Sequence, residues 1–380
     1  MARPTSRRSL RFENLEDRQL LSSAAPSNDQ QLALSLINMA RTNPQAASRW
    51  MGTVGSEVKR TLDYYKVDVD AVKATVASSR VLPPVAWNPD LADAAQAHSD
   101  DMATNQYQSH AGSDGSSPDD RIKSSGFKAT STGENAYAYA KSVDNAMQAF
   151  LYDWGVSDAG HRRNLQQPGV APGDSFTDVG VGVANATGKM GPVVVTQDFG
   201  RSASPAPQVV GVVYDDQNAD GFYTPGEGQG GVEIDATDVD SGQTNSTRTW
   251  GSGGYQMPLS PGRYKLTASK DDVVIKQVDM TVSNQNVDQD FVTSQPWDGR
   301  MRTAAVASNQ VKADPTAAVQ SAAISALSAP AAPPVTVKIP TATDSSPTPK
   351  MAVFTPADWK GPDVAASALA AWTTWKAKSV

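Results

Sequence analysis

A chain of 380 residues is long enough for two domains of ordinary size, and its hydrophobic content of 39% leaves room for segments that do not fold. A formal net charge of −7 offers no basic surface that could neutralise a run of phosphates, which excludes nucleic acid as an expected partner. The absence of cysteine excludes disulfides, zinc–thiolate sites and thiol catalysis, and the sequence contains no apolar run long enough to span a membrane.

The first 26 residues combine a basic start with a short motif. Arginines stand at positions 3, 7, 8 and 11, but charged residues interrupt the apolar segment that a signal peptide would place next. The run FENLEDRQLLS at 12–22 resembles the LEPR-xLL motif of exported planctomycete proteins, with Asp17 in place of the usual proline. The resemblance implies a bacterial source and export, so residues 1–26 are predicted to be an export leader. A plain charged leader is the alternative.

Residues 27–201 show helical periodicity first and strand-like segments afterwards. Three segments carry apolar residues at helical spacing: 27–51, which breaks at Asn43-Pro44, then 90–105 and 145–154. Two valine-rich segments predict strands: 178–184 and 193–199. Helices followed by strands favour an α+β domain.

The three histidines of the chain all lie in this region. His98 shares a predicted helix face with Leu91, which favours a hydrogen-bonded core residue over a ligand. His110 follows a helix in a loop, Glu134 is expected in a Gly-Glu-Asn loop, and His161 lies in the segment GHRRNL. Two imidazoles and a carboxylate could hold zinc or another divalent metal. They could equally form a hydrogen-bonded cluster in which the carboxylate raises the pKa of either histidine.

Seven short motifs in this region follow a characteristic order. They are LPPVAWNPDL at 82–91, AQAHSDDMA at 95–103, SH at 109–110, GEN at 133–135, GHRRNL at 160–165, VGVG at 179–182 and TQDFG at 196–200. Their order and spacing resemble the bacterial branch of the CAP superfamily (cysteine-rich secretory, antigen 5 and pathogenesis-related-1 proteins) over about residues 30–200. The resemblance implies an α–β–α sandwich, secretion, and a cleft lined by two histidines and two acids that sometimes holds a metal.

The resemblance also assigns residues to this cleft. His110 matches the first cleft histidine and Glu134 matches the acid of the Gly-Glu-Asn motif. Many eukaryotic members carry the second histidine just before the Thr-Gln strand, but residues 190–195 contain none, so His161 is expected to substitute. Asp158 is the nearest candidate for the second acid. No Gly-x-Ser-x-Gly elbow or His-Glu-x-x-His motif is present, so no catalytic residue is assigned.

Residues 202–207 (SASPAP) are a linker by composition, and the pattern changes after them. Five short strand candidates are separated by clusters of Gly, Pro, Asn and Asp: 209–214, 232–236, 255–259, 263–268 and 273–282. Their spacing predicts a small all-β, Ig-like sandwich over residues 208–293.

A calcium-loop pattern lies at the start of this second region. Residues 216–227 fit D-x-[DN]-x-[DN]-G-x5-E at every fixed position. The predicted ligands are oxygens of Asp216, Asn218, Asp220, Phe222 (through its carbonyl) and Glu227. A metal-free turn rich in Asp and Asn is the alternative. With GGVEI at 230–234 and LSPGRY at 259–264, the loop resembles SdrD B-like repeats of bacterial surface proteins. That resemblance implies a calcium-stabilised sandwich serving as a spacer or adhesion module.

Residues 294–380 are rich in Ala, Pro, Ser and Thr, which predicts a disordered tail in which a short C-terminal helix could form. The sequence as a whole predicts an extracellular or cell-surface bacterial protein, non-catalytic rather than an enzyme. Its cleft of His110, Glu134 and His161 is expected to bind a small ligand, with a lipid among the family-level candidates, or a metal. Extracellular or cell-surface components are the other expected partners. Two alternatives stay open: a metal-dependent hydrolase or peptidase using the same residues, and a structural surface or matrix protein.

Overall fold

The structure is a computed structural model that describes residues 25–294. The predicted leader up to residue 24 and the predicted tail from residue 295 lie outside the described residues. Within residues 25–294, no helix is long and apolar enough to cross a membrane.

The part of the chain that the structure describes opens with four helices whose boundaries follow from local sequence. α1 (Asn28–Thr42) begins at a capping box in which Ser27 and Gln30 satisfy each other's backbone N–H groups. Asn43 ends α1 and caps the next helix, and Pro44 occupies its first turn, where the missing N–H needs no partner. The other three helices are α2 (Pro44–Met51), α3 (Ser56–Tyr64) and α4 (Val69–Ala77). The predicted break at Pro44 is therefore confirmed.

A four-stranded sheet of order β1-β3-β4-β2 forms the centre of this first region. Its strands are β1 (Ala86–Trp87), β2 (Ala129–Ala140), β3 (Asp178–Asn185) and β4 (Val193–Ser202). β1 pairs with β3 in parallel, and the other two pairs are antiparallel. β2 is thus an edge strand, and only one of its sides is paired with another strand.

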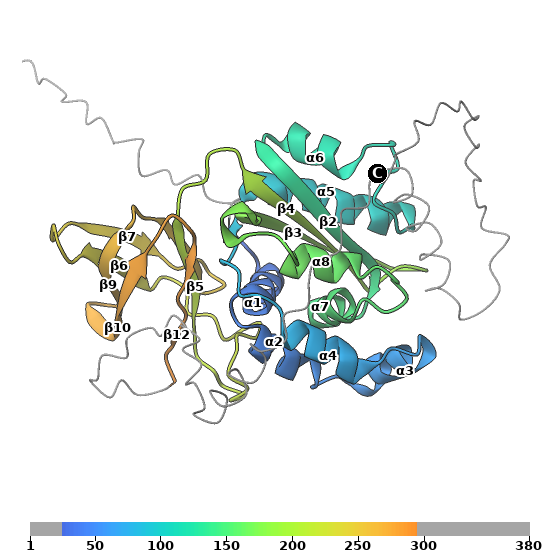
Figure 1. The fold of residues 1–380 in the computed structure, drawn as a ribbon, viewed down its shortest axis with the longest axis horizontal. Helices are drawn as coiled ribbons and strands as arrows, with labels where there is room; N and C mark the ends of the chain where they lie inside the picture. The colour runs from blue at the N-terminus through green and yellow to red at the C-terminus, as the bar shows by residue number, and fades with distance from the viewer. Residues whose placement is uncertain (1–24, 295–380) are drawn as a thin grey trace, which may run out of the picture. The chain divides into compact units, whose positions relative to one another are not determined.

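Helices cover both faces of this sheet (Figure 1). α5 (Pro89–Asn105) packs on one face along β3 and β4, with α6 (Pro118–Ser125) beside it. The opposite face carries α1, α7 (Val143–Tyr152) and α8 (Gly160–Gln166), and a short 3-10 helix, η2, spans Pro172–Asp174. α5 lies directly against the backbone of β3, because a Cβ atom added at Gly182 would meet the Ala95 carbonyl oxygen at 2.2 Å. Glycine at this position therefore permits the close approach of helix and sheet.

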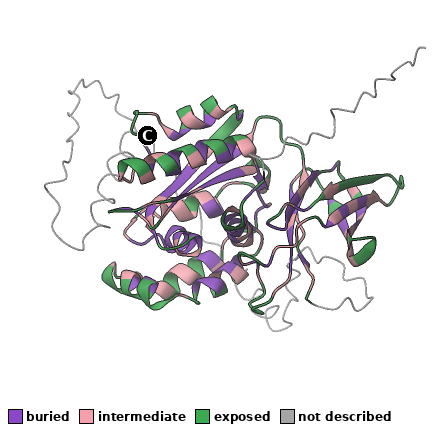
Figure 2. Cartoon of the chain, turned by 180° about the vertical axis from the view of Figure 1, so that it is seen from behind, coloured by how far each residue is buried: buried purple, intermediate pink, exposed green. Residues whose placement is uncertain are grey.

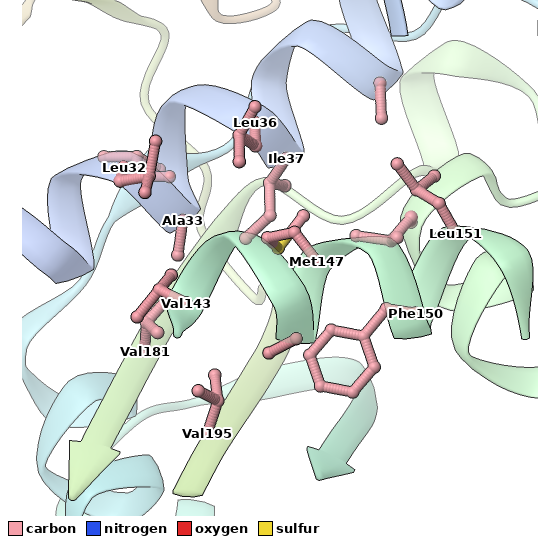
Figure 3. Packing of buried hydrophobic residues seen from close by; sticks show 14 of the residues in the cluster. Leu32, Ala33, Leu36, Ile37, Val143, Met147, Phe150, Leu151, Val181 and Val195 are labelled. Atoms are coloured by element: carbon pink, nitrogen blue, oxygen red, sulfur yellow. The ribbon is translucent and has the colours of Figure 1, made fainter. Parts of the chain in front are cut away.

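Strand alternation divides the apolar residues between the two faces. Val181 and Val195 point toward Met147 and Phe150 of α7, and Ile37 of α1 completes this side of the core (Figure 3). On the other face, Met102 of α5 packs with alternate residues of β2, β3 and β4. The strands are accordingly buried between two helical layers that expose their outer surfaces (Figure 2).

The second region is all-β. Its first sheet has the order β10-β9-β6-β7, and its second consists of β5 flanked by β11 and β12, with β8 paired to β5. The strands are β5 (Gln208–Tyr214), β6 (Glu233–Asp238), β7 (Thr244–Arg248), β8 (Gly254–Pro258), β9 (Gly262–Lys270), β10 (Val273–Val282), β11 (Val287–Asp288) and β12 (Phe291–Val292). Residues from both sheets form one hydrophobic cluster, as in a sandwich.

The predicted fold class, an α+β domain with helices on both sides of a sheet and then an all-β region, is confirmed. All five strand candidates of the second region coincide with strands of the structure. β7 and the two short strands β11 and β12 were not predicted.

Candidate functional site

Glu134 lies within β2, so the predicted Gly-Glu-Asn loop is wrong. The strand was missed because residues 129–135 are mostly polar, and the first three residues of β2 are exposed. Alternation sends Glu134 and Asn135 to opposite faces of the sheet. Glu134 faces the side of α5 and α6, where it contacts Arg121, and Asn135 faces the side of α8, where it contacts Asn164.

Glu134 is the centre of a buried group of charges, with only 2% of its side chain exposed. His110 Nδ1 lies 2.6 Å from Glu134 Oε1, and Arg121 Nη2 donates to Oε2 at 2.6 Å and to the His110 carbonyl at 3.0 Å. Burial alone would raise the pKa of Glu134. The hydrogen bond from His110 and the charges of His110 and Arg121 outweigh it and hold the pKa below its usual value. Glu134 is therefore an ionised carboxylate.

His161 is paired with Asp153, an acid that the sequence analysis did not name. It lies in the first turn of α8, where its Nδ1 is 2.6 Å from Asp153 Oδ1, and the Arg162 N–H donates to the other oxygen of Asp153 at 2.9 Å. The acid that contacts His161 is thus Asp153, and the candidacy of Asp158 stays a prediction. Asp153 ends α7 in the left-handed region with φ +56°, which turns its side chain back toward the following helix. Each site histidine therefore has its Nδ1 against a buried carboxylate.

A cavity of about 260 Å³ brings the predicted residues together. It is lined by His110, Ser117, Pro118, Asp119, Thr132, Gly133, Glu134, Gly160, His161 and Asn164. Apart from Pro118 and the two glycines, all of these side chains are polar. The expectation that His161 joins His110 and Glu134 in one cleft agrees with this arrangement.

An amide network explains how three of the sequence motifs meet at this cleft. Asn164 of α8 donates to the Glu134 carbonyl at 3.0 Å and to Asn135 Oδ1 at 2.9 Å. Asn135 donates in turn to Gln197 Oε1 at 3.0 Å and to the His161 carbonyl at 3.3 Å. The GEN, GHRRNL and TQDFG segments therefore fix α8 against β2 and β4 through side-chain amides.

A comparison with protein-family models finds a match to CAP, the cysteine-rich secretory protein family, over residues 34–199. These residues are a CAP domain. Among solved structures, the chain is similar to an extracellular protein containing an SCP domain from Bacillus anthracis str. Ames, with 28% identity and a TM-score of 0.27. That similarity covers 38% of this chain and 40% of the other, less than half of either. No curated protein matches the chain.

His98 has a structural place in the CAP domain, as its helix face predicts. It is fully buried on α5, and its Nε2 lies 2.8 Å from the carbonyl oxygen of Ser109, the residue before His110. Burial lowers the pKa of His98, an effect that the nearby Glu134 charge only partly offsets. His98 is therefore a neutral ring that donates from Nε2 and fixes the start of the His110 loop.

Asp101 is a further supporting residue that the sequence did not reveal. Its carboxylate accepts hydrogen bonds from the backbone N–H of Ser113 at 2.8 Å, from the Ser113 hydroxyl at 2.6 Å, from Asn105 at 2.6 Å and from the Tyr107 hydroxyl. Despite partial burial, these hydrogen bonds depress the pKa of Asp101 well below its usual value. Asp101 closes the loop from Tyr107 to Ser113, which carries His110 at its centre.

In the predicted calcium loop of the second region, carboxylates accept hydrogen bonds from the loop's own backbone N–H groups. Asp216 accepts the N–H groups of Asp220 and Gly221, each at 3.1 Å, and Glu227 accepts those of Gln217 at 3.1 Å and Thr224 at 2.9 Å. Gly221 has φ +84°, the sharp turn that the pattern requires. Among residues 25–294, no group of three or more His, Cys, Asp or Glu side chains is arranged to hold a metal ion. Calcium binding and the SdrD B-like resemblance therefore stay predictions.

Proposed function

We propose that the CAP domain binds a small, polar, hydrogen-bonding ligand in the cleft of His110, Glu134 and His161, and that the protein acts outside the cytoplasm. The observation that carries the proposal is the character of the cavity wall. Its rings, hydroxyls, amide and carboxylates can both donate and accept hydrogen bonds, and they surround about 260 Å³. That volume is slightly below the range of about 300–1,000 Å³ typical of pockets for drug-sized ligands, so a monosaccharide or one residue of a peptide is a suitable size.

The same wall argues against the lipid alternative. An acyl chain is held by apolar surface, since burial of its methylene groups supplies the free energy of binding. Pro118 is the single apolar side chain larger than hydrogen in this cavity wall. A fatty acid or sterol would therefore leave most of the polar wall without hydrogen-bond partners.

Zinc remains a separate prediction for the cleft. Both oxygens of Glu134 are engaged, one with His110 and one with Arg121, so this carboxylate supports the histidine rather than offering itself as a metal ligand. Equilibrium dialysis of the full chain against zinc, with and without a chelator, tests the metal alternative directly.

The hydrolase alternative has a weaker basis in the cleft. The two hydroxyls of the cavity wall are held by carboxylates: Ser117 donates to Asp120 at 2.7 Å, and Thr132 donates to Asp119. A nucleophilic hydroxyl would instead be hydrogen-bonded to a general base such as an imidazole. A peptide-library cleavage assay with and without chelator tests hydrolysis, and turnover would overturn the non-catalytic proposal.

The binding proposal is tested by thermal shift and amide NMR on the full chain. The probes are a set of monosaccharides, a set of tripeptides, palmitate, and zinc chloride. We expect a sugar or a peptide to raise the melting temperature and to shift resonances of the residues that line the cavity. Binding of palmitate or zinc alone would replace the proposal with the lipid or metal alternative, and a complete absence of binding would overturn it.

A matched pair of variants locates the binding. Thr132→Val removes a hydroxyl from the cavity wall, and Thr130→Val removes one from an exposed position on the same strand outside the cavity. Loss of one hydrogen bond corresponds to about 0.5–1.5 kcal/mol, or about 2- to 12-fold in Kd. We expect this weakening for Thr132→Val and none for Thr130→Val.

We also propose that the second region binds calcium in residues 216–227. The fit of residues 216–227 to the calcium-loop pattern and the sharp turn at Gly221 support this proposal. Burial raises the pKa of Asp220, and the neighbouring charges of Asp216 and Glu227 add to the rise. A divalent cation would relieve this mutual repulsion while the loop keeps its turn at Gly221.

A further inference from the structure

Asp198 is a buried acid behind the cleft whose role the sequence did not reveal. It lies on β4 directly opposite Glu134 of β2, and both side chains face the layer of α5 and α6. Asp198 is 0% exposed. Neither of its carboxyl oxygens accepts a hydrogen bond from an N–H or O–H donor within the part of the chain that the structure describes.

An ionised carboxylate in this position would be strongly disfavoured. Removing a charged group from water carries a large free-energy penalty unless hydrogen bonds or an opposite charge replace the water. Glu134 has such partners in His110 and Arg121, but Asp198 does not. The Glu134 carboxyl group, on the residue directly opposite in β2, lies on the same face of the sheet and is a neighbour with which Asp198 can share a hydrogen bond. Two carboxyl groups can form a hydrogen bond only when one of them carries a proton.

We propose that Asp198 is a neutral carboxylic acid that donates its hydrogen to Glu134, and that it acts as a positioning residue for this cleft carboxylate. The proton resides on Asp198 rather than Glu134, since Glu134 already receives hydrogen bonds from two other groups. With Asp198 the Glu134 carboxylate has three donors, which fixes its orientation and lets it accept the Nδ1–H of His110. The inference rests on the burial and pairing of Asp198, and it holds whether or not the cleft binds a ligand.

The charged groups around Asp198 favour the neutral form of its carboxyl group. β2 contributes Glu134, and α6 contributes Arg121 and Asp119. His98 on α5 and His110 in its loop face the Glu134 side of the pair, and Gly180 stands opposite Asp198 on β3. Burial raises the pKa of Asp198 well above its usual value, and Glu134 raises it further, against a smaller opposing effect of Arg121.

The test is the pH dependence of unfolding of the full chain, followed by urea titration with tryptophan fluorescence. A group whose pKa is raised by folding stabilises the protein at low pH, and this contribution is lost as pH rises toward the folded-state pKa. Asp198→Asn keeps the shape, can donate an amide hydrogen to Glu134, and does not titrate. Asp93→Asn, an exposed position on α5, is the matched control.

We expect the unfolding constant of the wild type, divided by that of Asp198→Asn, to grow at least tenfold between pH 5 and pH 7. One proton held only by the folded state gives up to a tenfold change per pH unit. The same ratio for Asp93→Asn should stay flat. A flat ratio for Asp198→Asn would mean that Asp198 is ionised, which overturns the proposal.

Two further measurements keep the proposal open to refutation if Asp198→Asn folds poorly. Asp198→Val also lacks the titrating group and should show the same growing ratio. Infrared spectroscopy at pH 7 should show the C=O band of a neutral carboxylic acid that disappears in either variant, and persistence of the full band would overturn the proposal.

The positioning role is tested by nitrogen NMR of His110, which shows which ring nitrogen carries the hydrogen. In the wild type and in Asp198→Asn the hydrogen should be on Nδ1. In Asp198→Val a smaller fraction of the His110 rings should carry it there.

Discussion

Replacing Glu134 by glutamine removes the negative charge that contacts both His110 and Arg121, while the shape of the side chain stays almost unchanged. In the wild type, this carboxylate is 2% exposed and makes two contacts of 2.6 Å, one with His110 and one with Arg121. The Arg121 side chain is only 11% exposed, so water cannot replace the lost partner well. The variant therefore leaves a guanidinium mostly buried without its counter-charge.

The size of the effect follows from this burial. Removing one partner of a buried ion pair destabilises proteins by about 3–5 kcal/mol. Glutamine retains one acceptor oxygen, so we expect about 3 kcal/mol, at the lower end of that range. For a domain the size of residues 34–199, each kcal/mol lost from the free energy of unfolding lowers the melting temperature by about 2–4 °C. The expected fall is therefore about 6–12 °C.

The assay is thermal unfolding of the full chain, with Glu57→Gln as the matched control. Glu57 and Lys141 form an ion pair at 4.0 Å in which both side chains are 54% exposed, and such pairs contribute little to stability. Glu57→Gln should change the melting temperature by no more than about 1 °C. Equal effects of the two variants would refute the view that Glu134 is the buried anchor of the cleft.

The pH dependence provides a second check on the same variant. The folded-state pKa of Glu134 lies below its unfolded value, so its stabilising contribution is present above an unfolded-state pKa of about 4.3 and is lost as pH falls. The difference in the free energy of unfolding between the wild type and Glu134→Gln should therefore be largest at pH 7 and decrease below about pH 4. A difference that stays constant down to pH 3 would contradict an ionised Glu134.

Three further predictions concern the supports of the cleft and the second region. Asp101→Asn should lower the melting temperature at pH 7 and by a smaller amount at pH 3, because the stabilisation from a depressed pKa is full above the unfolded-state value of about 4 and decreases as pH falls toward the folded-state pKa. A larger loss at pH 3 than at pH 7 would contradict this. Gly182→Ala should destabilise by about 1–3 kcal/mol or more in urea titration, since the new methyl group meets the α5 backbone, and Gly55→Ala, with open space around it, should be tolerated. Millimolar calcium should raise the melting temperature of the wild type but not of Glu227→Gln, and a shift of equal size in both would place calcium elsewhere.

Elements whose apolar spacing was regular could be predicted from sequence, and β2 could not. The helix predicted over 90–105 is α5, and the valine-rich strands are β3 and β4. β2 has few β-branched residues, and its first half is polar because it lies at an exposed sheet edge. Its pairing with β4 is a long-range interaction that local pattern does not encode. The local structure predicted for Glu134 was therefore wrong.

Two of the supporting acids, Asp153 and Asp198, were missed for different reasons. Asp153 reaches His161 only because the chain turns through a left-handed residue at the end of α7, and the eight-residue separation gives no hint of this contact. Asp198 did leave a signal. Its neighbours on β4 are buried on alternate faces, so an acid at this position must itself be buried and must find a partner across the sheet. Sequence alone could not say that the partner is another acid.

The two histidines reach the cleft from opposite faces of one sheet, and this arrangement bears on how a ligand would bind. His110 is fixed through Glu134 on the side of α6, and His161 is fixed through Asp153 on the side of α8. Gly133 lies between them on the edge strand, where a Cβ atom would press on Asn164 at 3.0 Å. The position of each ring thus depends on a buried carboxylate held by rigid elements. A ligand would therefore have to order these side chains very little on binding. A preorganised polar site of this kind distinguishes between ligands by hydrogen-bond geometry rather than by buried area.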